Sequence, residues 1–144
     1  MSKPIYVLGG PNLNLLGTRE PEIYGRDTLD DIHNRLKSLA GDIPVVAKQT
    51  NSEGELVTWV QEANREAAAV ILNAGAYTHT SVALHDALRA CSVPVVEVHL
   101  SNPAAREAFR QVNYVAPAVK ATIAGLGAYG YELALMAAKK LSGI

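Results

Sequence analysis

Short apolar runs alternate along the chain with longer segments in which apolar residues recur every three or four positions. The runs are typical of buried strands and lie at residues 5–8, 45–47, 69–72, 95–98 and about 118–124. The helical spacing occurs twice in full, in Leu29, Ile32, Leu36 and Leu39, and in Leu56, Val60 and Ala63. Two more helices are predicted at about residues 81–90 and 128–141. The pattern therefore predicts five strands and four helices that largely alternate along the chain.

Polar residues mark two of the helix starts. Thr28 precedes the first helical segment and is a plausible N-cap. Residues 52–55, Ser-Glu-Gly-Glu, fit a capping box. In this motif the serine hydroxyl accepts from the backbone N–H of the glutamate three residues later, and the glutamate side chain accepts from the backbone N–H of the serine. We therefore expect helices to begin directly after Thr28 and Ser52.

The strands are apolar throughout, which indicates burial on both faces and a parallel sheet. We predict an α/β protein of the flavodoxin-like class, with a five-stranded parallel sheet in the order 2-1-3-4-5 and helices on both faces. No linker or repeat divides the chain, so residues 1–144 are expected to form one domain. Ligands in such folds bind beyond the carboxyl ends of the strands, which directs attention to residues 9–26, 73–80 and 99–110.

Composition narrows the class of function. Hydrophobic residues make up 49% of the chain and charged residues 19%, as in globular proteins. Thirteen Lys and Arg against fourteen Asp and Glu leave a net charge of -1 without a basic stripe, so no nucleic-acid partner is expected. No apolar run approaches the roughly 18 residues of a membrane span, and the N-terminus lacks the features of a signal peptide. Neither a membrane nor a secretory role is expected.

The chain has few residues of the kinds that form disulfides or bind metals, and this excludes some kinds of site. Cys91 is the only cysteine, so an internal disulfide and a multi-cysteine zinc site are excluded, and a small core residue is the expected role. The four histidines lack metal-ligand spacing, so no metal is expected. Together these features favour a reducing, cytoplasmic location.

The loop after the first strand is far longer than the roughly 2–6 residues of an ordinary strand–helix connection. Its residues 17–26 carry a cation, Arg19, and a phenol, Tyr24, between glycines and a proline that can act as hinges. Such a segment could close over an anionic substrate as a lid. A solvated surface loop would have the same composition, and spacing alone leaves both interpretations open.

The loop after the third strand gathers an amide, an imidazole and hydroxyls just before a helix N-terminus, where free N–H groups favour anions. Its histidine, His79, could bind an anion or simply cap or pack the helix. At the end of the fourth strand, Glu97 and His99 share one face. A carboxylate beside an imidazole makes it a better proton donor, although a structural salt bridge would use the same residues.

Other candidate residues carry weaker signals. Arg106 and Arg110 lie four positions apart, either as binding groups or as a solvated pair. Residues 125–130 match the dinucleotide motif GxGxxG, but only fourteen residues follow, so a tight turn with close helix–strand packing is predicted instead. Lys48 is the nearest candidate for a Schiff base and is a weak one, because it lies outside the polar loops.

Six motifs occur in one order along nearly the whole chain. They are residues 10–17 (Gly-Pro-Asn-Leu-Asn-Leu-Leu-Gly), 19–25 (Arg-Glu-Pro-Glu-Ile-Tyr-Gly), 51–56 (Asn-Ser-Glu-Gly-Glu-Leu), 76–84 (Ala-Tyr-Thr-His-Thr-Ser-Val-Ala-Leu), 97–102 (Glu-Val-His-Leu-Ser-Asn) and 123–127 (Ile-Ala-Gly-Leu-Gly). With these motifs the chain closely resembles type II 3-dehydroquinate dehydratase, an enzyme of the shikimate pathway.

The resemblance implies a single catalytic domain, assembled as a dodecamer of trimers. It implies dehydration of 3-dehydroquinate to 3-dehydroshikimate by anti elimination through an enolate, without metal or organic cofactor. Tyr24 would be the base, supported by Arg19, and Asn12 would stabilise the enolate through a bound water. His99 would be the acid that protonates the departing hydroxyl, with Glu97 orienting it.

The resemblance also implies the residues that hold the substrate. Its carboxylate and hydroxyls would be bound by Asn73, His79, Leu100, Ser101 and Arg110. Asp86 matches an aspartate that, in relatives, serves the site of a neighbouring subunit. A free tyrosine has a pKa of about 10, so a tyrosine base needs nearby cations, for which Arg19 and Arg110 are the candidates.

The sequence departs from the family pattern at several positions. Relatives commonly carry Asn at Gly9, Pro at Ala74, Arg at His85 and His-x-Ser at residues 111–113, where this chain has Gln-Val-Asn. The proposed acid, base and anion-binding residues are all retained. The departures at Gly9, Ala74 and residues 111–113 nevertheless motivate an alternative, a binding or regulatory protein that keeps the pocket and has lost turnover. A flavodoxin-like flavin protein is a third hypothesis.

Overall fold

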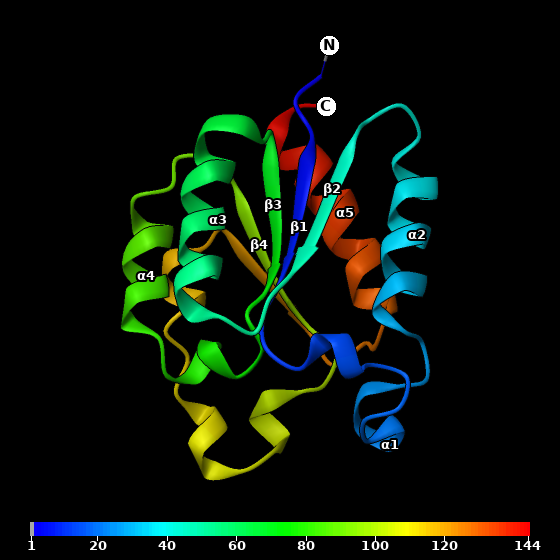
Figure 1. Ribbon diagram of the computed structural model, residues 1–144, viewed down its shortest axis with the longest axis vertical. Coiled ribbons are helices and arrows are strands. Elements are labelled where there is room, and N and C mark those ends of the chain that lie inside the picture. The colour runs from blue at the N-terminus through cyan, green and yellow to red at the C-terminus, as the bar shows by residue number, and fades with distance from the viewer. Residues whose placement is uncertain (1) are drawn as a thin grey trace.

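The computed structural model describes residues 2–144. Its centre is a five-stranded sheet in which neighbouring strands are parallel and follow the order β2-β1-β3-β4-β5 (Figure 1). The strands are β1 (Ile5–Gly9), β2 (Val45–Gln49), β3 (Ala69–Asn73), β4 (Val95–His99) and β5 (Ala121–Ala124). This confirms the predicted flavodoxin-like fold and its strand order.

Four of the strands extend beyond the predicted apolar runs. β1 to β4 end at Gly9, Gln49, Asn73 and His99, one or two residues later than the hydrophobic pattern indicates. Backbone pairing continues through these residues, and Gly9 is paired with both Gln49 and Asn73. β5 begins later than predicted, because residues 116–118 form a 3-10 turn. The sheet therefore carries polar side chains at its carboxyl edge.

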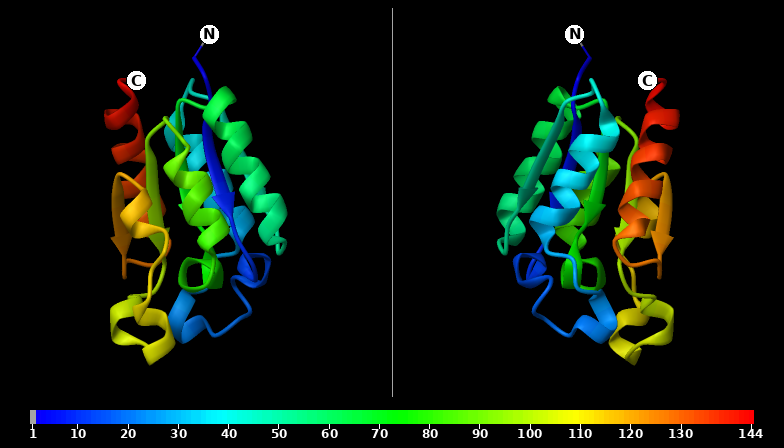
Figure 2. Two further views of the ribbon diagram at one scale, coloured as in Figure 1. Left: turned by 90° about the vertical axis from the view of Figure 1, so that its left-hand side faces the viewer. Right: turned by 90° about the vertical axis from the view of Figure 1, so that its right-hand side faces the viewer.

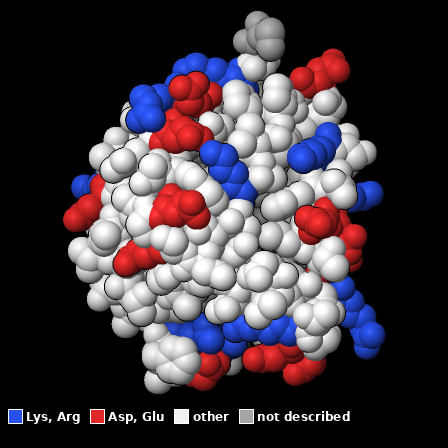
Figure 3. Space-filling view, viewed as in Figure 1, with Lys and Arg blue, Asp and Glu red and all other residues white. Residues whose placement is uncertain are grey.

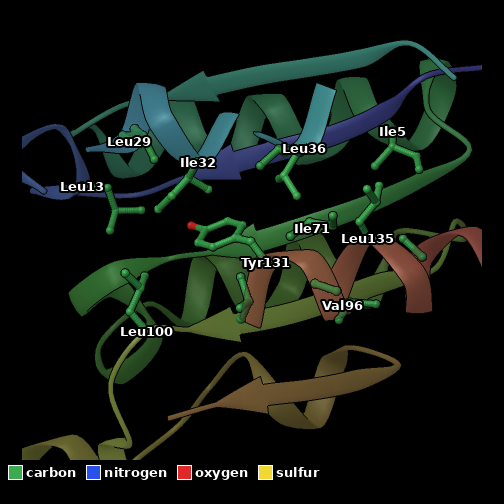
Figure 4. Close-up of a cluster of buried hydrophobic side chains, with 14 of the residues drawn as sticks. Ile5, Leu13, Leu29, Ile32, Leu36, Ile71, Val96, Leu100, Tyr131 and Leu135 are labelled. Atoms are coloured by element: carbon green, nitrogen blue, oxygen red, sulfur yellow. The ribbon is translucent and has the colours of Figure 1, made fainter. Parts of the chain in front are cut away.

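Helices cover both faces of the sheet (Figures 1 and 2). One apolar cluster joins the sheet to α2 (Leu29–Ala40) and α5 (Tyr129–Ser142), and the other joins it to α3 (Glu53–Glu66) and α4 (Val82–Arg89). Figure 4 shows the first cluster, in which Tyr131 of α5 lies among side chains from α2 and the strands. None of the helices in residues 2–144 is long and apolar enough to cross a membrane.

The two predicted helix caps differ in one respect. Thr28 accepts a hydrogen bond from the Asp31 N–H, and the Asp31 carboxylate accepts one from the Thr28 N–H, both at 3.0 Å, so a full capping box begins α2. Ser52 accepts from the Glu55 N–H at 3.2 Å and caps α3 as predicted. The reciprocal half of that box is replaced, because the Ser52 N–H donates to the Thr50 hydroxyl at 3.0 Å.

The predicted lid segment, residues 17–26, contains a short helix that the sequence pattern did not indicate. This helix, α1 (Pro21–Tyr24), begins with a proline, which suits a first helical position, and is followed by the C-cap residue Gly25 with φ +87°. Its last residue, Tyr24, is only 9% exposed and belongs to the apolar cluster between α2 and α5. The segment therefore packs against the body of the protein.

The first and third loops meet at the end of β1. The Gly10 N–H donates to the Asn73 carbonyl at 2.8 Å, and a β-carbon at position 10 would overlap the carbonyl of Ala74. A β-carbon at Gly75 would lie 2.9 Å from the carbonyl oxygen of Pro11. Glycines at both positions allow the two backbones to approach this closely.

We expect Gly10→Ala to destabilise the protein, because the added methyl meets backbone that cannot move aside. A cost of about 3 kcal/mol corresponds to a fall of roughly 6–12 °C in the thermal midpoint. The matched control is Gly54→Ala, since Gly54 lies in α3 with nothing within 4 Å of an added β-carbon. That control should hold or raise the midpoint. Equal midpoints for the two variants, measured at one protein concentration, would contradict the explanation.

Candidate active site

The loops that follow β1, β3 and β4 enclose a pocket at the carboxyl edge of the sheet. Its empty space, including the open mouth, is about 530 Å³. Nine of the eleven predicted site residues line it, namely Asn12, Arg19, Tyr24, Asn73, His79, His99, Leu100, Ser101 and Arg110. In the space-filling view, Lys and Arg gather along this end of the molecule beside Asp and Glu (Figure 3).

Tyr24 contacts two guanidinium groups. Arg106 Nη1 donates to the Tyr24 hydroxyl oxygen at 2.9 Å and to the Ser101 hydroxyl at 3.2 Å. The Arg19 guanidinium lies over the Tyr24 ring, with its Cζ 4.5 Å from the ring centroid. Two positively charged groups therefore contact the Tyr24 side chain.

Arg106, and not Arg110, is the second arginine at Tyr24, which corrects the expectation from the sequence. Asn102 caps a 3-10 turn over residues 103–105, and this turn brings Arg106 back over the pocket. Arg110 lies on the next 3-10 turn and also lines the pocket, where its Nε donates to Glu107 at 3.0 Å. The other Glu107 carboxylate oxygen lies 3.3 Å from Arg106 Nε, so one acid contacts both arginines.

Glu97 and His99 form a buried pair at the end of β4. His99 Nε2 lies 2.6 Å from a Glu97 carboxylate oxygen, Thr122 donates to the other oxygen at 2.7 Å, and the Asn113 amide donates at 3.2 Å. Burial alone raises the pKa of the Glu97 carboxyl, but the hydrogen bonds from His99, Thr122 and Asn113 outweigh it and hold that pKa below its ordinary value. The pair is therefore a carboxylate that orients an imidazole.

Two further pocket side chains, those of Asn73 and His79, are held by backbone groups, and Asn12 has an unusual backbone. Asn12 has a left-handed backbone, with φ 70°, at the start of a 3-10 turn. The Asn73 side-chain oxygen accepts from the Gly75 N–H at 3.1 Å. His79 Nδ1 lies 2.7 Å from the Val112 carbonyl oxygen. A carbonyl only accepts, so Nδ1 carries the proton and Nε2 stays available to a ligand.

Two predicted site residues do not line the pocket. Glu97 lies behind His99 and has no exposed surface, in agreement with an orienting role. Asp86 is exposed on α4, away from the pocket. A contribution of Asp86 to the site of a neighbouring subunit stays a prediction.

The unusual residues 111–113 each make a structural contact. Gln111 donates to the Pro103 carbonyl at 2.9 Å and so ties the two 3-10 turns together. The Val112 carbonyl holds His79, and Asn113 donates to the buried carboxylate. These departures from the family pattern therefore preserve the support of the pocket.

The other departures also fit their surroundings. Ala74 has φ -78°, close to the value that a proline ring enforces. His85 Nδ1 lies 2.7 Å from the Tyr114 carbonyl oxygen, so this imidazole is held by a neighbouring loop. Gly9 ends β1, and its only close approach for an added β-carbon is 3.0 Å from a Leu13 methyl group.

The remaining candidates have structural roles. The predicted tight turn at residues 125–130 is confirmed, since the Gly130 N–H donates to the Gly127 carbonyl at 3.1 Å, and a β-carbon at Gly130 would lie 3.3 Å from a Val98 methyl group. Lys48 forms a 2.7 Å ion pair with Glu62. Among residues 2–144, His, Cys, Asp and Glu nowhere form a group of three or more that could hold a metal ion.

Comparison with known proteins agrees with this geometry. The family model for dehydroquinase class II matches residues 3–139. The 3-dehydroquinate dehydratase of Hyphomonas neptunium is 78% identical over 143 residues, which cover 99% of this chain and 97% of that protein. That of a Caulobacter species is 57% identical, with 99% of each chain covered.

Solved structures give the same result. The type II dehydroquinase of Propionibacterium acnes has a TM-score of 0.90 at 44% identity and covers 100% of this chain and 99% of its own. That of Butyrivibrio crossotus has a TM-score of 0.92 at 37% identity, with coverage of 96% and 98%. The match in sequence, strand order and length places the pocket in a known context: this chain belongs to the class II dehydroquinases, the type II 3-dehydroquinate dehydratase family.

Proposed function

We propose that the pocket dehydrates 3-dehydroquinate to 3-dehydroshikimate by anti elimination through an enolate, with Tyr24 as the base and His99 as the acid. The observation that carries the proposal is the pairing of a buried phenol in contact with two guanidinium groups and a carboxylate-backed imidazole on the walls of one pocket. The reaction needs a base for the proton next to the ketone, an acid for the leaving hydroxyl and a stabiliser of the enolate.

Tyr24 takes the proton as its phenolate. Arg106 stabilises that charge by a direct 2.9 Å hydrogen bond, and Arg19 adds a second positive charge from the lid segment. Burial of the phenol strengthens both interactions, because little water screens them. Closure of residues 17–26 over the substrate would bring Arg19 and Tyr24 to the reacting carbon together.

His99 delivers a proton to the hydroxyl that leaves as water. Its Nε2 is occupied by the bond to Glu97, so the proton passes through Nδ1. The negative charge of Glu97 stabilises the protonated imidazole before the transfer. General acid and general base groups each contribute factors of about 10²–10⁴ to the rate.

The remaining residues bind and stabilise. Asn12 holds a water that stabilises the developing enolate, and Asn73, His79, Leu100, Ser101 and Arg110 hold the carboxylate and hydroxyls of the substrate. Arg110 is the cation best suited to the carboxylate, since a guanidinium can bind it through two parallel hydrogen bonds. We further propose cytoplasmic operation without metal or cofactor, in a dodecamer of trimers in which Asp86 faces a neighbouring site.

Tyr24→Phe should lower kcat by about 10³-fold, because the variant lacks the group that takes the proton. The measurement is the rise in ultraviolet absorbance of the conjugated product from 3-dehydroquinate, with EDTA present. Substrate binding by calorimetry should persist, since the ring stays in place. Tyr129→Phe, at a tyrosine that is 56% exposed, is the control and should keep the rate. A Tyr24→Phe enzyme of normal rate would exclude Tyr24 as the base.

Arg106→Ala should lower kcat by about 10²-fold, the loss typical of a donor that stabilises charge in the transition state. The same assay applies, with Arg35→Ala as the matched control. Arg35 is a surface arginine whose side chain is 63% exposed and pairs with Glu132. The idea fails if both arginine variants keep the original kcat.

The lowered pKa of Glu97 makes stability depend on pH. A carboxyl whose pKa is lower in the folded state stabilises the folded protein when the pH is above the ordinary pKa of about 4.3. That stabilisation is lost as the pH falls through the lowered pKa. The stability advantage of the original protein over Glu97→Gln should therefore shrink as the pH falls from 5.5 to 3. Denaturant unfolding at each pH measures it. A stability difference between the two proteins that stays constant with pH would contradict the lowered pKa of Glu97.

A further inference from the structure

A cluster of polar side chains lies between the loops that follow β1, β2 and β3. Its members are Gln49, the last residue of β2; Asn51, just before α3; and Tyr77, in the 3-10 turn Gly75–His79. These side chains do not line the pocket. Residues 51–56 are nevertheless one of the motifs that carry the family resemblance, and the proposed reaction leaves their role unexplained.

Asn51 connects this cluster to the pocket through Asn12. The Asn51 side-chain oxygen accepts from the backbone N–H of Asn12 at 3.0 Å and from Gln49 Nε2 at 3.1 Å. Both groups are donors, which fixes the orientation of the Asn51 amide with its oxygen toward them. Gln49 Nε2 also donates to the Gly10 carbonyl at 3.1 Å, so the same contacts hold the chain on both sides of Pro11.

Asn12 needs such support because of its backbone. Its φ of 70° and ψ of -1° lie in the left-handed region, which side chains other than glycine adopt rarely. Asn12 and Leu13 both line the pocket, and Leu13 is also buried in the apolar core, so the turn joins the pocket wall to the core. Loss of the bond to the Asn12 N–H would favour relaxation of this turn.

Asn51 is itself held from the third loop. The Tyr77 hydroxyl donates to the Asn51 carbonyl oxygen at 2.6 Å. The next residue, Ser52, donates its N–H to the Thr50 hydroxyl at 3.0 Å, which fixes the chain just before α3. Asn51 therefore presents its amide from a fixed position.

We propose that Asn51 is a positioning residue for the dehydration: its amide holds the left-handed turn at Asn12 and thereby places the Asn12 side chain for the enolate. The proposal rests on the proposed role of Asn12. A neutral amide suits the task, because an aspartate would accept the same bonds and add negative charge near a developing anion.

A double-mutant cycle tests this with the assembled enzyme. Asn51→Ala should lower kcat about five- to ten-fold, the factor that corresponds to one backbone hydrogen bond, with little change in KM. In the Asn12→Ala background, Asn51→Ala should cause no further loss, because the side chain that it places is absent. A general structural role would lower the rate in both backgrounds by the same factor.

Asn64→Ala is the matched control, because the Asn64 oxygen also accepts a backbone N–H, that of Ser92 at 2.7 Å, away from the pocket. It should keep kcat. Tyr77→Phe, which removes only the bond to the Asn51 carbonyl, should give a smaller loss that also vanishes in the Asn12→Ala background. This milder variant decides the matter if Asn51→Ala fails to fold.

The outcomes separate the two proposals. Asn12→Ala at the original kcat would remove the enolate role of Asn12, and the role of Asn51 with it. A slow Asn12→Ala enzyme would uphold that role. An Asn51→Ala enzyme of normal rate, or losses that multiply in the double variant, would then overturn the role of Asn51 alone.

Discussion

Glu97 carries its charge at a position of β4 that water does not reach, and a buried charge is tolerated only where hydrogen bonds replace the lost solvent. Three donors satisfy it, and each constrains a different part of the fold. Thr122 reaches it because β4 and β5 pair in the register that sets the two residues side by side. Asn113 donates to Glu97 while its oxygen accepts from the N–H groups of Val115 and Ala116, both at 2.8 Å. His99, the third donor, is thereby fixed where the strand meets the pocket.

The order and type of the elements could be predicted from the sequence, because apolar runs and helical spacing are local signals. The ends of the strands could not, since Gln49, Asn73 and His99 are polar and are held in the sheet by pairing with distant residues. The short helix before Gly25 was missed for a related reason. Its four residues are too few for a periodic pattern, and packing of Tyr24 against the core stabilises it.

The candidate site was predictable where residue type and position after a strand are informative, as for His79 and His99. Its supporting contacts were not. Arg106 and Tyr24 are 82 positions apart, and Thr122 and Glu97 are 25 apart, so only the folded chain joins them. The spacing of Arg106 and Arg110 suggested a shared helical face, whereas two consecutive 3-10 turns direct both arginines into the pocket.

Tyr24 belongs to the apolar cluster beneath α2 and α5 although it lies on residues 17–26. Any movement of this segment away from the pocket therefore brings aromatic surface into water together with the hydroxyl. Exposure of apolar surface raises the heat capacity by about 0.45 cal/K/mol per Å². The free-energy difference between the closed and displaced forms must then be a curved function of temperature. Cooling weakens the hydrophobic contribution that keeps the Tyr24 ring buried. The position of the phenol is thus coupled to the thermodynamics of the core.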